Sequence, residues 1–147
     1  MPDEDQSGLH VWLILSKAYR SVAVNARKHI ESLDLCLSDF AVLEVLLHKG
    51  PLPVNTIGAK VVLTSGSVTT AIDRLEAKGL VTRANDPGDR RTRIVHLTRA
   101  GRKLIQGAFA AHRDVMEEAF APLSPAERST LVRLLKKAGI HAARLAG

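Results

Sequence analysis

The spacing of apolar side chains predicts long helices at both ends of the chain. From Leu9 to about Leu33 the apolar residues recur every three or four positions, which predicts one long helix, buried along much of its length. A second long helix is expected to begin after Thr98 and to end near Pro122. A third begins at Ser124, where serine, proline and glutamate occupy the N-cap, first and third helical positions of a capping box.

Shorter elements are predicted between these long helices. Ser38 is the expected N-cap of a mostly buried helix that ends at Gly50-Pro51. A short helix is then predicted from Val54 to about Val61, followed by another helix with Thr64 as its N-cap. In that helix the core-facing stripe contains Val68, Ala71, Ile72 and Leu75, and the remaining face is small, polar and rich in hydroxyl groups.

A β-hairpin is predicted after Gly79, a residue suited to the left-handed conformation that ends a helix. Its strands are expected at Leu80–Arg83 and Arg93–Leu97, and the Pro87-Gly88 pair between them is typical of a turn. Arg90 and Arg91 follow this turn closely, so the hairpin is expected to have a basic tip.

Composition limits what such a chain can do. The chain has 147 residues, enough for one compact domain, and aromatic residues make up 3%, so the core must be built from aliphatic side chains. The net charge is +6, and residues 64–103 hold nine basic residues against four acidic ones, which accounts for +5 of it. Concentrated positive charge favours a polyanionic partner such as nucleic acid.

Other function classes lack their signatures. We expect neither a metal site nor a cofactor, because a single cysteine, Cys36, precludes cysteine pairs and the histidines lack ligand spacing. No catalytic constellation is discernible, so an enzyme is not expected. With an acidic start and no long apolar run, the protein is expected to be cytoplasmic, without membrane association.

Two short helices followed by a basic hairpin is the order of a winged helix-turn-helix, in which the second helix lies in the major groove of DNA. The expected fold is therefore mainly α with a small β-hairpin wing. Hydroxyl side chains allow close approach to base edges, and arginines bind guanine or phosphate. The predicted DNA-binding residues of the helix pair and the first strand of the hairpin are Thr64, Ser65, Ser67, Thr69, Thr70, Arg74 and Arg83.

The stretches from Val68 to Val81, Asp86 to Arg91 and Val95 to Gly101 resemble the MarR family of bacterial transcription regulators, the multiple-antibiotic-resistance type. The resemblance covers roughly residues 8 to 145. It implies that Arg91 enters the minor groove and that Asp89 orients it through a charge-assisted hydrogen bond, whereas Arg90 and Arg93 are expected to contact phosphates.

The resemblance also implies a homodimer that binds double-stranded DNA at a pseudo-palindromic operator. Residues 1–34 and 98–147 are expected to form the helical dimerisation region and residues 35–97 the DNA-binding lobe, which together make one intertwined domain. The interface candidates on the last helix are Leu131, Leu134, Leu135 and Leu145, although packing within one chain would equally explain them.

Many members of the family resemble repressors that a small aromatic or phenolic ligand releases from DNA. Candidate ligand-binding residues are His10, Trp12, Tyr19, Arg20 and His112, each of which also suits an ordinary core or surface position. Two alternatives stay open: a regulator without an inducer, and a redox sensor that acts through Cys36. The apolar neighbours of Cys36 favour a buried, inert thiol.

Overall fold

The computed structural model describes residues 3–61 and 65–147, so the predicted N-cap Thr64 lies outside the described residues. A single-turn 3₁₀ helix, η1 (Glu4–Gln6), precedes the long helix α1 (Gly8–Glu31). A lobe of short elements follows, with α2 (Leu37–Lys49), β1 (Leu52–Pro53), α3 (Val54–Lys60), α4 (Ser65–Ala77), β2 (Val81–Asp86) and β3 (Asp89–Leu97). Two long helices, α5 (Arg99–Ala119) and α6 (Pro125–Ala146), complete the chain.

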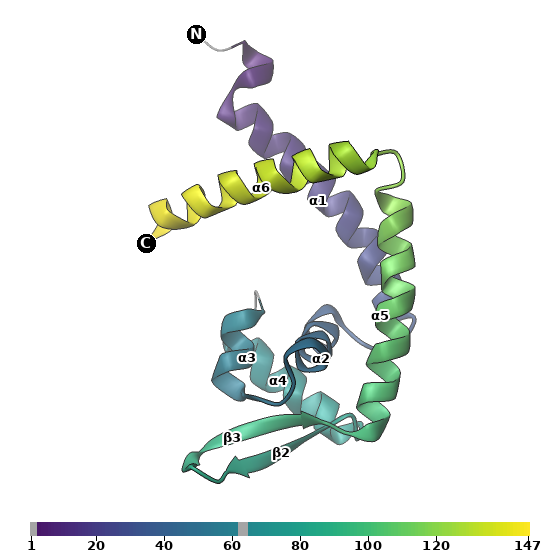
Figure 1. Cartoon of the computed structure of the whole chain (residues 1–147), viewed down its shortest axis with the longest axis vertical. Coiled ribbons are helices and arrows are strands. Elements are labelled where there is room, and N and C mark those ends of the chain that lie inside the picture. Colours follow the sequence, from purple (N-terminus) through teal and green to yellow (C-terminus); the bar gives the residue numbers. More distant parts are fainter. Residues whose placement is uncertain (1–2, 62–64) are drawn as a thin grey trace.

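The predicted fold class, mainly helical with a small β wing, is confirmed (Figure 1). The lobe lies at one end of the molecule, and α5 runs from the base of the wing to the opposite end. There α6 turns away from α5 and crosses α1 in the view of Figure 1.

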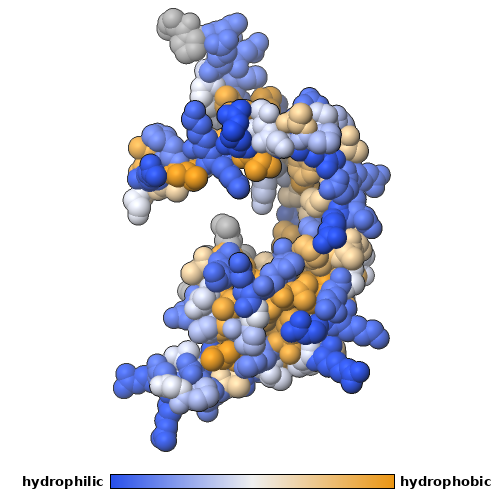
Figure 2. All heavy atoms as spheres, viewed as in Figure 1, coloured by the Kyte–Doolittle hydropathy of each residue, from blue (hydrophilic) through white to orange (hydrophobic). Residues whose placement is uncertain are grey.

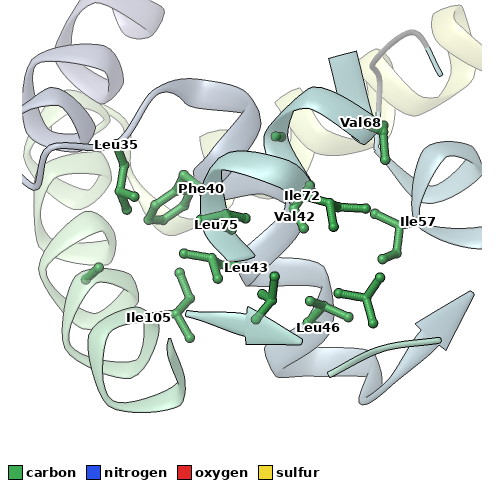
Figure 3. Packing of buried hydrophobic residues seen from close by; sticks show 14 of the residues in the cluster. Leu35, Phe40, Val42, Leu43, Leu46, Ile57, Val68, Ile72, Leu75 and Ile105 are labelled. Carbon is green, nitrogen blue, oxygen red and sulfur yellow. The ribbon is translucent and has the colours of Figure 1, made fainter. Parts of the chain in front are cut away.

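The core lies within the lobe and against the adjoining part of α5 (Figure 3). The predicted stripe of α4 is confirmed, since Val68, Ala71, Ile72 and Leu75 are all buried. They pack with residues from α2, from α3 and from α5, among them Leu43, Leu46, Ile57 and Ile105.

The prediction that the first helix is buried along much of its length is wrong for the single chain. Ile30 is the one buried residue of α1, and α6 has none. Large apolar side chains stay exposed instead, including Trp12 at 62%, Tyr19 at 73% and Leu145 at 76%. The predicted helix is present, but its apolar face extends beyond the lobe that could cover it. Figure 2 shows hydrophobic residues at the surface along α6.

Helix ends agree with the sequence at most positions. Ser124 and Glu127 form the expected reciprocal capping box of α6, and the Thr98 hydroxyl accepts a hydrogen bond from Gly101 N at the start of α5. Gly50 ends α2 as predicted. Gly79 has φ +73°, the left-handed conformation expected of a glycine that ends a helix.

The predicted N-cap Ser38 is wrong, because α2 begins two residues earlier. Cys36 is the N-cap, and its backbone N–H donates to the carboxylate of Asp39, the third helical residue, at 3.2 Å. A carboxylate at this position satisfies one of the orphan amides of the helix start.

The wing belongs to a three-stranded antiparallel sheet in the order β1-β3-β2. Strand β1, which the sequence did not predict, pairs Leu52 with Val95 and Pro53 with Ile94. Both hairpin strands extend farther than predicted, so the Pro87-Gly88 turn is the whole loop between them. The Asp86 carboxylate accepts a hydrogen bond from Gly88 N at 2.9 Å and so fixes this turn.

Candidate nucleic-acid interface

The surface of α4 divides into three strips around its buried stripe. At 100° per residue, Thr70 lies nearly opposite the core, whereas Arg74 lies on one flank and Thr69 and Asp73 lie toward the other. The first flank faces the linker between α1 and α2, and the second faces the wing. The predicted hydroxyl-rich face is therefore narrower than the sequence pattern indicated.

Arg74 lies on the linker-facing flank, where its guanidinium binds the protein itself. Its Nε and one terminal nitrogen donate to Asp39 Oδ1 at 3.1 and 2.9 Å. The same terminal nitrogen contacts the Ser38 hydroxyl at 3.1 Å and the Cys36 thiol at 3.2 Å. The hydrogen bonds to Asp39 raise the pKa of Arg74 above its ordinary value. This arginine was predicted from its exposed helical position to reach DNA.

Arg83 lies on the opposite flank and is also paired within the chain. Its guanidinium binds the carboxylates of Asp73 and Glu76 on α4, and its backbone N–H donates to Glu76 Oε2 at 3.1 Å. The Arg83 side chain retains only 17% of its exposure. Strand β2 is thereby joined to α4.

The wing carries three arginines that, unlike Arg74 and Arg83, lie outside the ion pairs of the described residues. Arg90, Arg91 and Arg93 are exposed, and within the described residues no ion pair engages them. All three lie on β3 near the turn. Their positive charge is therefore accessible to a ligand. Long cationic side chains near the tip of a hairpin can follow a phosphate backbone or enter a groove.

The Asp89 carboxylate does not bind the guanidinium of Arg91, as the resemblance implied, but binds its backbone. Its carboxylate accepts a hydrogen bond from the backbone N–H of Arg91 at 2.9 Å and from the Thr92 hydroxyl at 3.1 Å. Between the described side chains of Asp89 and Arg91 there is no ion pair, so the guanidinium of Arg91 is free to turn toward a ligand. Asp89 shapes the backbone at the start of β3 instead.

A hollow of about 570 Å³ separates the wing from the helix pair. It is lined on the helix side by Asn55 and Thr69 and on the wing side by Arg91, Thr92 and Arg93. Amide, hydroxyl and guanidinium groups on facing walls suit a phosphate backbone. Asn55, an exposed polar residue of α3, was not among the predicted contacts, although its position in the first helix of the pair was a usable signal.

The remaining predicted contacts are only partly described. Ser67 lies on the linker-facing side, where it lines a hollow together with Cys36 and Ser38. Ser65 begins α4, and Thr69 and Thr70 are exposed on it. Apart from Thr64, which lies outside the described residues, the predicted set thus lies on α4 and the wing, with Arg74 and Arg83 on the flanks.

The five predicted ligand-binding residues do not come together in the single chain. Tyr19 and Arg20 line a hollow of about 280 Å³ on α1 with Arg27, and Trp12 and His10 lie two turns or more toward the N-terminus. His112 packs instead on His29, ten residues or about 15 Å along α1 from Tyr19.

His112 lies in an aromatic cluster where α1, α2 and α5 meet. Its ring stacks on His29 at 5.9 Å and lies tilted against Phe40 at 5.0 Å between ring centres. Burial lowers the pKa of His112 below its ordinary value of 6.5, and the neighbouring His29 lowers it further, while Glu44 opposes the shift. The His112 imidazole is therefore kept neutral near pH 7.

The prediction of a buried thiol at Cys36 is wrong, since this residue is exposed. It lies at the N-cap of α2, where the helix start leaves it at the surface between Ser38 and Arg74. The apolar neighbours that suggested burial diverge, because Leu35 enters the core and Leu37 stays 41% exposed.

A helix pair with a basic hairpin packed beside its second helix defines a winged helix-turn-helix DNA-binding protein. Residues 35–92 match the MarR family. The chain is 38% identical over 137 residues to the HTH-type transcriptional regulator MhqR of Bacillus subtilis (strain 168), which covers 93% of this chain and 94% of that protein. The chain therefore belongs to the MarR family of transcriptional regulators, and it is not an enzyme.

Solved structures agree with this assignment. The chain is 29% identical to Bordetella bronchiseptica BpsR, from a study of how 6-hydroxynicotinic acid regulates the DNA binding of that protein, with a TM-score of 0.79 over 88% of this chain and 98% of that one. A mutant of Escherichia coli MarR in complex with operator DNA shares the fold, with a TM-score of 0.81 at 23% identity over 93% and 99% of the two chains.

Within the described residues, no helix is long and apolar enough to span a membrane.

Proposed function

We propose that this protein is a homodimeric repressor that binds a pseudo-palindromic operator and is released from it by a small aromatic ligand. The observation that carries the dimer is the exposed apolar surface of the long helices. The chain exposes 10444 Å², whereas a compact monomer of 15.9 kDa would expose about 7,400 Å². An excess of this size matches what large, stable dimer interfaces cover.

Many of the exposed large apolar side chains lie on the two helices that the lobe leaves uncovered. On α1, Leu9 and Trp12 are 69% and 62% exposed, and on α6, Leu135 and Leu145 are 44% and 76% exposed. Water contact at so many large apolar side chains is unfavourable, and a second copy of the chain presents the same faces for a two-fold interface. Packing α1 and α6 between subunits removes both faces from water at once.

A two-fold dimer sets the form of the operator. Two α4 helices related by the dimer axis would enter successive major grooves, so half-sites are expected about one helical turn apart. Arg91 and Arg93 of each wing would then contact DNA beside each half-site. The hydroxyl groups of α4, with Thr70 farthest from the core, would face the bases.

For the effector, support comes from a relative and from the chemistry of α1. BpsR, at 29% identity, is regulated in its DNA binding by 6-hydroxynicotinic acid, an aromatic acid. In this chain an exposed tyrosine ring and two guanidinium groups, those of Tyr19, Arg20 and Arg27, line one hollow. An aromatic ring with a carboxylate would stack on the first and pair with the others.

The oligomeric state is tested by sedimentation of the parent protein and of Leu135→Glu. The parent is expected to sediment as a dimer, and the variant as a monomer that binds DNA weakly, because a charge would be buried at the interface. Arg133→Glu changes the charge on the opposite face of α6 and is the matched control. A parent protein that stays monomeric at the concentrations where it binds DNA would refute the dimer.

The effector is tested on the protein bound to a duplex that it selects from its source genome. Salicylate, 4-hydroxybenzoate and 6-hydroxynicotinate are titrated as probes, with cyclohexanecarboxylate as the non-aromatic control. Release by an aromatic acid, weakened in Arg20→Ala, supports the proposal. Binding to the duplex that no aromatic acid reduces would favour a regulator without an inducer and would leave the DNA-binding assignment intact.

A further inference from the structure

Two cations, one on the linker-facing flank of α4 and one directly after that helix, bind the start of α2 and the linker before it. Arg74 reaches Asp39 at the start of α2, and Lys78, one turn later, reaches the carbonyl and the carboxylate of Asp34 in the linker itself. Lys78 directly follows α4, and its backbone N–H donates to Arg74 O at 3.0 Å, so the two cations lie on the same side of the chain. In Figure 1 this linker leads from α1 into the lobe.

Asp39 is the acceptor that makes this contact specific. It is 2% exposed, and among the described residues it is the one buried charged residue. One carboxylate oxygen accepts two hydrogen bonds from Arg74, and the other accepts the backbone N–H of Cys36. A carboxylate that is removed from water needs such partners, so the start of α2 and the middle of α4 are held by one group.

The geometry points to Arg74 as a positioning residue: with Asp39 it fixes the orientation of the recognition helix against the start of α2, and it does not read DNA. The inference rests on DNA binding by α4 and is independent of the proposed dimer and effector. A planar guanidinium that donates twice to one carboxylate oxygen and also contacts Ser38 defines the rotation of α4 about its axis. That rotation decides which hydroxyl groups face the bases.

The competing role for Arg74 is a direct contact to phosphate or guanine, which its helical position alone would suggest. The two roles predict opposite effects at Asp39. If Arg74 acts through Asp39, removal of the carboxylate charge weakens DNA binding. If Arg74 binds DNA, loss of the carboxylate frees the guanidinium and leaves DNA binding unchanged or tighter.

The test measures the dissociation constant for a duplex that the parent protein selects from a random-sequence library, over a series of salt concentrations. The variants are Arg74→Ala, Arg74→Lys, Asp39→Asn and the Asp39→Asn/Arg74→Ala pair, with Arg133→Ala on α6 as a control for charge. Each single change at the Arg74–Asp39 pair is expected to weaken binding roughly tenfold, and the double change no further, because the pair acts as a unit.

The salt dependence separates position from contact. Loss of one phosphate contact reduces the magnitude of the slope of log association constant against log salt concentration by about 0.9. A displaced helix leaves this slope unchanged. Arg74→Lys keeps the charge but loses the planar fork, so it is expected to behave like Arg74→Ala. If Asp39→Asn fails to fold, the two Arg74 variants still decide the question.

Three results would overturn the inference. The first is a lower salt slope in Arg74→Ala, the second is near-parental binding by Arg74→Lys, and the third is equal or tighter binding by Asp39→Asn. Parental binding by all variants would equally refute it.

Discussion

Gly101 of α5 lies directly against the carbonyl group of Leu80, so that a Cβ added at Gly101 would lie 1.9 Å from the Leu80 oxygen. That carbonyl also accepts a hydrogen bond from Thr98 N at 3.0 Å. The entry into β2 and the start of α5 thus share one close backbone contact, which joins the lobe to the long helix.

Gly101→Ala is therefore expected to destabilise the protein. Alanine favours a helix by up to about 1 kcal/mol over glycine, but the overlap with backbone atoms forces α5 away from Leu80, at a cost on the order of 2 kcal/mol. Urea unfolding measures the difference. Gly107→Ala on the same helix, where the added Cβ meets nothing within 4 Å, is the control and should be neutral or stabilising.

Arg91→Ala is expected to weaken binding to a selected duplex by about 1–3 kcal/mol, because this exposed arginine has no ion-pair partner among the described residues and lines the hollow beside the wing. Fluorescence anisotropy with labelled duplex measures it. Lys136→Ala, exposed on α6 and outside the lobe, removes the same charge as a control. Parental affinity of Arg91→Ala would show that the wing arginine does not contact DNA.

The stability of the protein is expected to fall as the pH drops below about 6.5. Burial lowers the pKa of His112, so below its ordinary value the unfolded chain takes up a proton that the folded chain does not, and the free energy of unfolding decreases until the lowered pKa is passed. His29 and Glu44 face the same ring and modulate the effect.

His112→Phe should flatten this part of the pH profile, because phenylalanine packs against Phe40 without binding a proton. Urea unfolding between pH 5 and pH 7.5 measures it, and His141→Phe on exposed α6 is the control. A profile in His112→Phe that matches the parent at every pH would assign the effect to another group.

Cys36→Ser is expected to keep or raise stability by about 0.5 kcal/mol, because a hydroxyl is a better N-cap acceptor than a thiol, whereas Cys36→Ala should lower it. Thermal unfolding measures both. The same serine variant tests the redox alternative in a DNA-release assay with oxidant: an unchanged response would remove Cys36 as a sensor.

The local features of the fold could be predicted from sequence, because each depends on neighbouring residues. The capping box at Ser124, the glycine at position 79 and the core stripe of α4 all follow from short-range geometry. The predicted N-cap of α2, Ser38, is wrong because serine is a common N-cap residue wherever it occurs before a helix. Asp39 indicated the true position, since an acidic third helical residue places the N-cap three residues earlier, at Cys36. Strand β1 has two residues, too few for any pattern.

Long-range relations could not be predicted, because the sequence does not say which element covers which face. The period of α1 correctly identified an apolar face but not that the lobe leaves it exposed. Arg74 and Asp39 are 35 positions apart, and Arg83 pairs with two acids of α4, so neither ion pair appears in the sequence order. The fold is needed to show that these two arginines are paired within the chain, whereas those of the wing have no ion-pair partner among the described residues.

The short pairing of β1 with β3 gives the wing unequal stiffness along its length. At Ile94 and Val95 the strand β3 pairs with β1 on one side and with β2 on the other, whereas nearer the turn its register with β2 shifts between the Asn85–Arg93 pair and the Asp86–Asp89 pair. The base of the hairpin is therefore fixed to the lobe, and its tip is a two-stranded ribbon free to bend about that base. In the proposed complex with DNA, such a ribbon would let Arg90 and Arg91 follow local variation in groove width while α4 stays in place.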